Sequence, residues 1–279
     1  MRKDMKRFGM WCGALLALLG AMTSCEKALK NAPASLAEIQ KPSSELAVIQ
    51  VDSVRVDSTW KFHDPDLSEY GDCPPSFSCV MDVPSFDQAP ILANAVMEWV
   101  NEECLRGTYS GDVTQVKQML EAVMRSESDE DVVVNYNIRK VYENACVITF
   151  VCTCDMFAYG AHGMETFTGA TFRKSDGKRF GWNMFRLAAD LQTCLRGGLE
   201  KYFETKDSAA LADELFLDEV HSIDDLPRPL TEPWLEADGI QLLYQSYEIA
   251  SYADGQPLVT IPVKDAESLL TPTAYSLFK

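Results

Sequence analysis

The alternation of hydrophobic and polar residues changes its period several times along the chain. Valine, isoleucine or an aromatic residue at every second position predicts a strand. Such stretches cover residues 47–62, 132–142 and 166–173. Residues 77–83, 240–244 and 258–261 are further short strand-like segments, and the long apolar run 145–157 suggests a central strand. Apolar residues that recur three or four positions apart predict a helix instead. That spacing covers residues 90–106, 112–125, 183–204, 209–217 and 265–270.

Two Asp-Gly pairs indicate tight turns between predicted strands. Gly177 and Gly239 supply the positive φ that such reversals need. A hairpin at Gly177 makes the sheet largely antiparallel. Because strands and helices come in mixed blocks, the predicted fold class is α+β, with largely antiparallel sheets, helices packed on one face and two related subdomains.

The first 24 residues have the pattern of a bacterial lipoprotein signal peptide. A basic stretch precedes apolar residues 8–20, which are too few to span a bilayer. Small residues then lead to Cys25, as in a lipobox, although Met22 stands where a branched aliphatic residue is usual. We therefore expect Cys25 to be acylated, by palmitate or a similar chain, and to tether an extracytoplasmic protein to the membrane. The alternative is an ordinary secretory signal that is cut nearby.

Beyond the signal, the charge of the chain narrows the choice of partners. The mature chain from Cys25 onward keeps 21 basic and 41 acidic side chains, which gives a net charge of −20. Nucleic-acid binding requires a basic patch, so we expect no nucleic-acid partner. A strongly negative surface speeds encounter with a cationic protein. The alternative is that the acidity serves solubility alone.

Cysteine usage gives one candidate disulfide and no metal site. Cys73 and Cys79 flank a proline-rich loop, and exported proteins allow disulfides, so we predict that they pair. Cys152 and Cys154 share one strand face and are expected to be small buried residues. Their spacing does not match the paired ligands of a zinc site. We therefore predict no metal and no cofactor.

The pentapeptide Tyr-Gly-Ala-His-Gly at 159–163 is the clearest candidate site. Gly160 and Gly163 would let the chain leave a long strand in conformations barred to residues with a Cβ. His162 would then tie the turn to backbone groups. Catalysis would require a nucleophile and an orienting group, and no known catalytic motif supplies them. We predict a structural turn, with a binding surface as the alternative, and no catalytic residue.

Tyr247 and Tyr252 are the other candidate binding residues, together with the nearby Tyr244. Tyrosines can stack on the sugar rings of a glycan or anchor a protein interface. The alternative is that they are half-buried residues of a sheet.

The ordered set of motifs resembles an uncharacterised domain at the C-terminus of the bacterial anti-sigma-V factor. The shared motifs are Tyr159–Gly163, the turn at Asp176–Lys178, a helix opening at Phe185, Asp238–Ile240, the run over Tyr247–Gly255, and Ile261–Pro262. Tyr159 departs from the family motif, which has glycine at this position.

The resemblance implies a domain organisation. Residues 25–46 would be a tether and residues 156–279 the anti-sigma-V-factor-like α+β domain. Residues 47–155 would be the companion α+β domain that also precedes some peptidoglycan deacetylase domains. Neither a deacetylase domain nor a cytoplasmic sigma-binding helix is recognisable in the sequence.

The resemblance also implies a function, because the domain of the anti-sigma factor is a receptor for lysozyme, a cationic hydrolase. We predict a membrane-tethered, non-enzymatic module of the cell envelope, periplasmic or at the cell surface. Its ligand would be a cell-envelope protein, such as a lysozyme-like hydrolase, or a peptidoglycan-related molecule. The alternatives are an enzyme acting on cell-wall glycan or peptide, and a purely structural lipoprotein within a larger complex.

Overall fold

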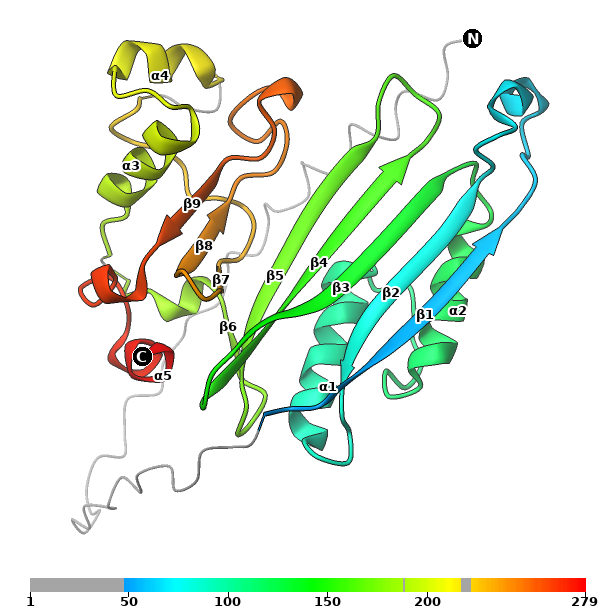
Figure 1. Ribbon diagram of the computed structural model, residues 1–279, viewed down its shortest axis with the longest axis horizontal. Coiled ribbons are helices and arrows are strands. Elements are labelled where there is room, and N and C mark those ends of the chain that lie inside the picture. The colour runs from blue at the N-terminus through cyan, green and yellow to red at the C-terminus, as the bar shows by residue number, and fades with distance from the viewer. Residues whose placement is uncertain (1–47, 188, 217–221) are drawn as a thin grey trace, which may run out of the picture. The chain divides into compact units, whose positions relative to one another are not determined.

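The structure is a computed structural model that describes residues 48–187, 189–216 and 222–279. The predicted signal peptide, Cys25 and the tether lie outside these residues. The larger sheet has six strands in the order β1-β2-β3-β4-β5-β6, and only β2 and β3 are parallel neighbours (Figure 1). The strands are β1 (Val51–Thr59), β2 (Ser76–Pro84), β3 (Val133–Glu143), β4 (Val147–Phe157), β5 (Met164–Arg173) and β6 (Arg179–Phe180).

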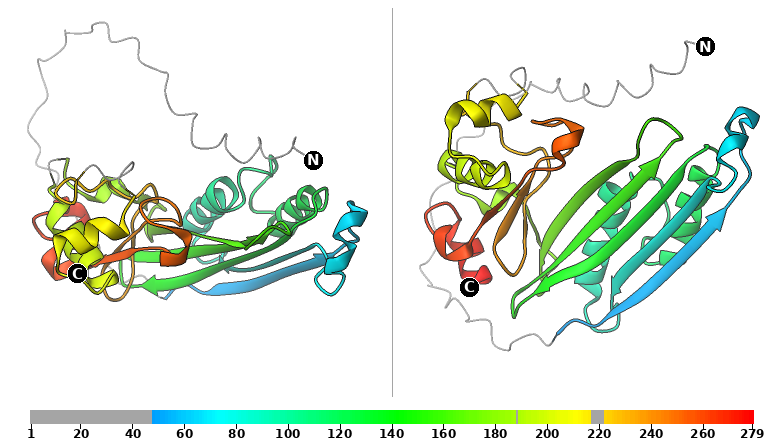
Figure 2. Two further views of the ribbon diagram at one scale, coloured as in Figure 1. Left: turned by 90° about the horizontal axis from the view of Figure 1, so that it is seen from above. Right: turned by 45° about the horizontal axis from the view of Figure 1, so that its top comes forward.

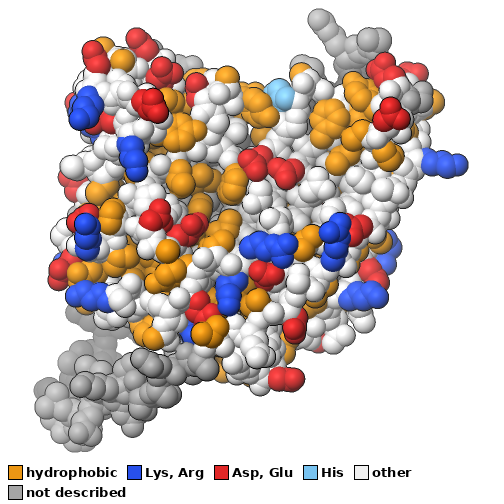
Figure 3. Space-filling view, in the orientation of Figure 1, with side chains coloured by type: hydrophobic (Ala, Val, Ile, Leu, Met, Phe, Trp, Pro, Cys, Tyr) orange, Lys and Arg blue, Asp and Glu red, His pale blue; other side chains and the backbone are white. Residues whose placement is uncertain are grey.

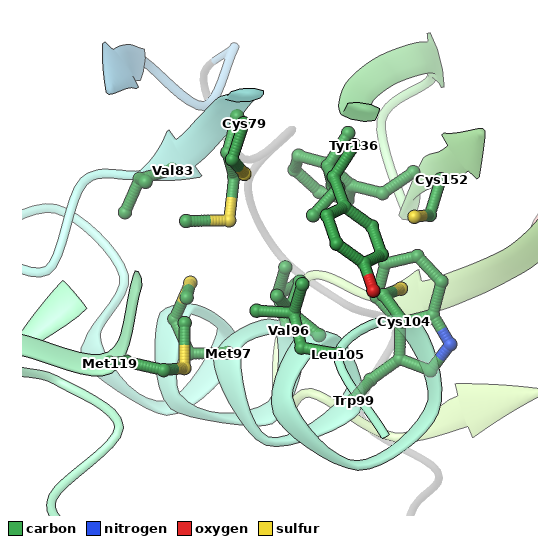
Figure 4. Packing of buried hydrophobic residues seen from close by; sticks show 14 of the residues in the cluster. Cys79, Val83, Val96, Met97, Trp99, Cys104, Leu105, Met119, Tyr136 and Cys152 are labelled. Carbon is green, nitrogen blue, oxygen red and sulfur yellow. The ribbon is translucent and has the colours of Figure 1, made fainter. Parts of the chain in front are cut away.

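Two helices between β2 and β3 cover one face of this sheet (Figure 2). They are α1 (Pro90–Trp99), which continues as a π-helical turn over Val100–Cys104, and α2 (Val116–Glu127). Every second residue of the inner strands points at the helices, so period-two alternation in the sequence becomes a hydrophobic core. Figure 4 shows Cys79 and Tyr136 of the sheet lying over Val96 and Trp99.

A second core lies around a three-stranded antiparallel sheet in the order β7-β8-β9. The strands are β7 (Trp234–Leu235), β8 (Ile240–Leu243) and β9 (Leu258–Ile261). The helices that accompany them are α3 (Gln192–Tyr202), α4 (Ser208–Glu214) and α5 (Pro272–Phe278). This part of the chain buries a largely separate set of leucines, isoleucines and aromatic residues.

The two sheets meet where β7 lies against β5. Trp234 packs on Gly169, and a Cβ on this glycine would overlap the indole ring. The backbone N–H of Leu235 donates to the hydroxyl of Thr171 over 2.8 Å. These contacts fix the position of the segment that follows β8, which carries two of the candidate residues.

The α+β class predicted from the sequence is confirmed, as is the mainly antiparallel larger sheet. Two predicted helices differ from the structure. The helix predicted from residue 183 begins only at Gln192. A 3₁₀ turn covers Trp182–Met184, and Phe185 after it is extended and forms a bridge with Leu270. Residues 265–270 form turns, and the final helix begins at Pro272. The predicted domain boundary at 155/156 lies inside β4.

Candidate functional site

Three aromatic rings from two distant segments meet beside β5. His162 comes from the hairpin between β4 and β5, whereas Tyr247 and Tyr252 come from the segment between β8 and β9. The rings of His162 and Tyr252 are stacked with their centroids 4.0 Å apart, and those of Tyr247 and Tyr252 are 5.8 Å apart. We call these three residues the ring stack. The two tyrosines retain 47% and 37% of their accessible surface, so the ring stack is open to a ligand.

Two glutamine side chains dock the segment between β8 and β9 onto β5. The amide of Gln245 pairs with both the N–H and the carbonyl of Phe167, as a neighbouring strand would, at 3.3 and 2.6 Å. Gln256 donates to the carbonyl of Glu165 over 2.8 Å. The carboxylate of Glu248 closes the tight turn over residues 245–248 by accepting from the N–H of Gln245, and Tyr247 lies inside this turn with φ of +67°. These bonds hold both tyrosines at the end of the hairpin.

The imidazole of His162 is engaged at both nitrogens. Nδ1 lies 2.8 Å from the carbonyl of Gly163, and Nε2 lies 3.3 Å from the hydroxyl of Tyr247. A carbonyl can only accept, so Nδ1–H donates to it, and Nε2 is left facing the phenol hydroxyl, which can both donate and accept. Within the described residues, neither nitrogen contacts a carboxylate, a serine or a thiol. This arrangement positions a ring and supplies no partner for nucleophilic catalysis.

The backbone of the pentapeptide turns differently from the prediction. Neither Gly160 nor Gly163 adopts a positive φ, so the expected use of glycine freedom is wrong at both positions. A Cβ on Gly160 would meet open space. Tyr159 instead takes the left-handed conformation, with φ of +52°. Non-glycine residues accept this cost where packing compensates it.

The packing around Tyr159 supplies that compensation. Its side chain is buried, and its ring lies 5.0 to 5.2 Å from the rings of Phe62, Tyr70 and Phe157. The phenol donates to the carbonyl of Cys73 over 2.9 Å, and burial raises its pKa to about 12. Tyr159 therefore anchors the loop before β2 and is not part of the exposed ring stack.

The predicted disulfide between Cys73 and Cys79 is wrong, because both thiols are free. Cys73 lies exposed in the loop before β2. Cys79 is fully buried on the side of β2 that faces the helices (Figure 4). The loop leaves Cys73 at the surface, whereas the alternation along β2 turns Cys79 into the core. Burial raises the pKa of Cys79 to about 12, which makes it an inert core residue.

A hollow of about 300 Å³ lies beside the ring stack, on the face of the larger sheet opposite α1 and α2. We call this face the open face. Tyr252 and Phe157 contribute aromatic surface to the hollow, and Asn135, Asp155 and Glu165 contribute polar groups. Asp155 and Glu165 face each other across β4 and β5. Burial, reinforced by the charge of Asp155, raises the pKa of Glu165.

A second hollow, of about 510 Å³, lies on the open face over β1 and β2. Its polar lining includes Asp57, Ser78 and Asn135. Figure 3 shows the open face, where white polar side chains and backbone cover much of the strands and charged groups are scattered. Sequence analysis missed these polar residues. The polar positions of the alternating strands, combined with the register of the hairpin, are the signal that could have found them.

The described residues offer few other sites. No group of three or more histidine, cysteine or acidic side chains in them lies close enough to hold a metal ion. None of the described helices has the length and apolar character needed to cross a membrane.

Comparison with known proteins relates this fold to a family of unknown function. Residues 190–264 match the model of a family described as "Protein of unknown function (DUF3298)". This range contains Tyr247 and Tyr252 of the ring stack but not His162. A search of curated proteins finds no match.

Two solved structures of DUF3298 family proteins share the fold. One, from Bacteroides fragilis, has 16% identity and a TM-score of 0.63, over 85% of this chain and 99% of its own. The other, from Pseudomonas aeruginosa, has 11% identity and a TM-score of 0.60, over 83% of this chain and 98% of its own. At these identities the likeness concerns the fold alone. The resemblance to the anti-sigma-V factor stays a prediction.

Proposed function

We propose that this chain is a lipid-anchored, extracytoplasmic binding module that holds a cell-envelope ligand on its open face, beside the ring stack. The observation that carries this proposal is the meeting of three exposed rings with a polar hollow. Binding sites combine apolar surface with a few polar groups that fix orientation. The ligand would be a cationic envelope protein, such as a lysozyme-like hydrolase, or a peptidoglycan-related molecule.

The geometry of His162 supports a non-enzymatic role. A general base must reach the proton that it removes, and a nucleophile must lie beside its base. Here the imidazole instead bonds a backbone carbonyl and a phenol. Asp155 and Glu165 are close neighbours on one hairpin, so they lie on the same side of any ligand in the hollow. A pair of glycosidase carboxyls would flank the scissile bond instead.

The extracytoplasmic location is supported by the sequence alone. The basic stretch, the short apolar run and the small residues before Cys25 are those of a lipoprotein signal. The net charge of −20 on the mature chain would favour encounter with a cationic partner at low ionic strength.

Binding by the full-length protein in a detergent without a sugar head group tests this function. Two probes are used: lysozyme, by calorimetry at low and moderate salt, and purified peptidoglycan, by co-sedimentation. Binding of either probe is the expected result, and lysozyme affinity should fall as salt rises because exposed charges are screened. Failure of both probes to bind at low salt would contradict the proposal.

A further inference from the structure

A single row of polar side chains crosses five strands of the open face. Asp57 is opposite Ser78, which is opposite Asn135, and the row continues through Asp155 to Glu165. Residues directly opposed on neighbouring strands point to the same side of a sheet. Since strands lie about 4.8 Å apart, the row extends over about 19 Å, long enough for roughly four pyranose rings.

This row forms the floor of both hollows. Asn135 lines the hollow over β1 and β2 and also the one beside Tyr252. The two hollows therefore meet at β3 and form one trough, which runs across the strands and ends at the ring stack. We use the word trough for these two hollows together.

The trough offers hydrogen-bonding groups to a ligand. In the part of the chain that the structure describes, the side chain of Asn135 makes no hydrogen bond, so its amide is available both to donate and to accept. The hydroxyl of Ser78 donates to Asp57 over 2.8 Å and can still accept. Asp155 and Glu165 add acceptors at the far end. Such a mixture suits a ligand whose groups both donate and accept along its whole length.

The composition of the trough disfavours a protein as the occupant. Centres of protein interfaces are depleted of serine, aspartate and glutamate, and rely on buried aromatic or arginine anchors. The floor between the two ends of the trough consists of Ser78 and Asn135 instead. A peptide in β form would pair with the edge of a sheet, whereas the trough lies on a face whose backbone groups are already paired.

Resting on the proposed function, we infer that the trough binds an oligosaccharide, which lies across the strands with one terminal sugar against Tyr252. Sugar hydroxyls match the polar row, and the apolar face of a pyranose ring matches an exposed tyrosine. The carboxylates of Asp155 and Glu165 would repel sugars that carry acid groups. Arg55 also lines the hollow over β1 and β2, but its charge is paired with that of Asp57. The ligand is therefore a neutral or amino sugar chain of about four units.

Calorimetry with N-acetylglucosamine oligomers of increasing length tests this inference on the full-length protein in the same detergent. Affinity should rise by about tenfold or more from the single sugar to the tetramer, and by less than about twofold beyond it, because the trough is then full. Polygalacturonate oligomers of equal length should bind at least about tenfold more weakly. Equal affinity for the single sugar and the hexamer would contradict the inference that an oligosaccharide lies along the trough.

Two asparagines on β3 provide a matched pair of variants. Asn135→Ala should weaken tetramer binding by about tenfold, through lost hydrogen bonds at the centre of the trough. Asn137→Ala is the control, because Asn137 is exposed on the same face but lines neither hollow. Equal losses in the two variants would contradict the placement of the ligand.

The outcomes separate this inference from the proposed function. If lysozyme or peptidoglycan binds but no oligosaccharide does, the inference of an oligosaccharide ligand is wrong, whereas the proposed function as a binding module is supported. If none of the probes binds, both are wrong.

Discussion

The ion pair of Glu143 and Lys174 is the clearest buried charge interaction in the described residues. The ammonium group of Lys174 lies 2.6 Å from the carboxylate of Glu143, and both side chains are almost fully buried. Glu143 also accepts from the N–H of Ile49 and from Lys140. Burial alone would raise the pKa of Glu143, but these three donors outweigh it, and the pKa lies below its ordinary value. The pair therefore fastens the chain just before β1 to the sheet.

Glu143→Gln should destabilise the protein by about 3 kcal/mol near neutral pH, because it removes the carboxylate charge that lies 2.6 Å from the buried Lys174 ammonium. A depressed folded-state pKa stabilises the fold above the ordinary carboxyl pKa and loses this effect as pH falls through the folded value. The difference between wild type and variant should thus shrink on acidification. Urea unfolding at a series of pH values measures it, and a difference independent of pH would contradict the ionic role.

Single residues also show which features of the structure could not be predicted from the sequence. The glycines of the pentapeptide pointed to the turn, but the residue with a positive φ is Tyr159. Its conformation is set by contacts with Phe62, Tyr70 and Phe157, and the first two of these lie far away in sequence. Local propensity carries no information on such packing. The Cys73–Cys79 prediction failed for a related reason, since spacing alone does not show which way each side chain points.

At the scale of elements, the two adjacent glycines of α3, Gly197 and Gly198, differ in how closely the rest of the protein packs on them. Glycine is a poor helix former, so either residue lowers the helical propensity of this segment. In the structure, Gly198 faces β9, and a Cβ there would overlap the side chain of Val259. A Cβ on Gly197 would meet nothing within 4 Å. The close approach of α3 to β9 therefore depends on Gly198 alone.

Alanine at these two positions gives a matched comparison. Gly198→Ala should destabilise the protein by about 1–3 kcal/mol, because Val259 or the helix must move. Gly197→Ala should stabilise it by roughly 0.5–1 kcal/mol, because alanine favours the helix and nothing obstructs it. Denaturant unfolding of both variants measures the effects. Equal effects of the two substitutions would show that α3 does not pack as described.

Elements with strong periodicity could be predicted from the sequence, and those held by tertiary contacts could not. The strands β2, β3 and β4 lie within a few residues of their predicted ranges, because β2 and β3 bury every second residue and β4 is a long apolar run. The segment before α3 has helical spacing, yet only a 3₁₀ turn forms there, and Phe185 after it is extended and bridges to Leu270. A contact between residues so far apart has no local signal.

At the scale of the whole molecule, the α+β class followed from the order of the elements, whereas the site depended on how they assemble. His162, Tyr247 and Tyr252 each stood out in the sequence, but nothing in it brings together residues that are 85 positions apart. Gln245 and Gln256 do so by pairing with β5. The polar row of the open face was missed because acidic and amide side chains are common in this chain. Only the register of five strands aligns them.

The central claim is that a ligand rests on the open face against the ring stack. The most direct test compares Tyr252→Ala with Tyr275→Ala, a partly buried tyrosine on α5, in the full-length protein. Both variants are first checked for unchanged folding, and their affinities are then measured for whichever probe, lysozyme or peptidoglycan, binds the wild type. The account predicts that Tyr252→Ala weakens binding by about tenfold or more, as loss of a central aromatic contact does, while Tyr275→Ala leaves it within about twofold. Undiminished binding by Tyr252→Ala would contradict the account.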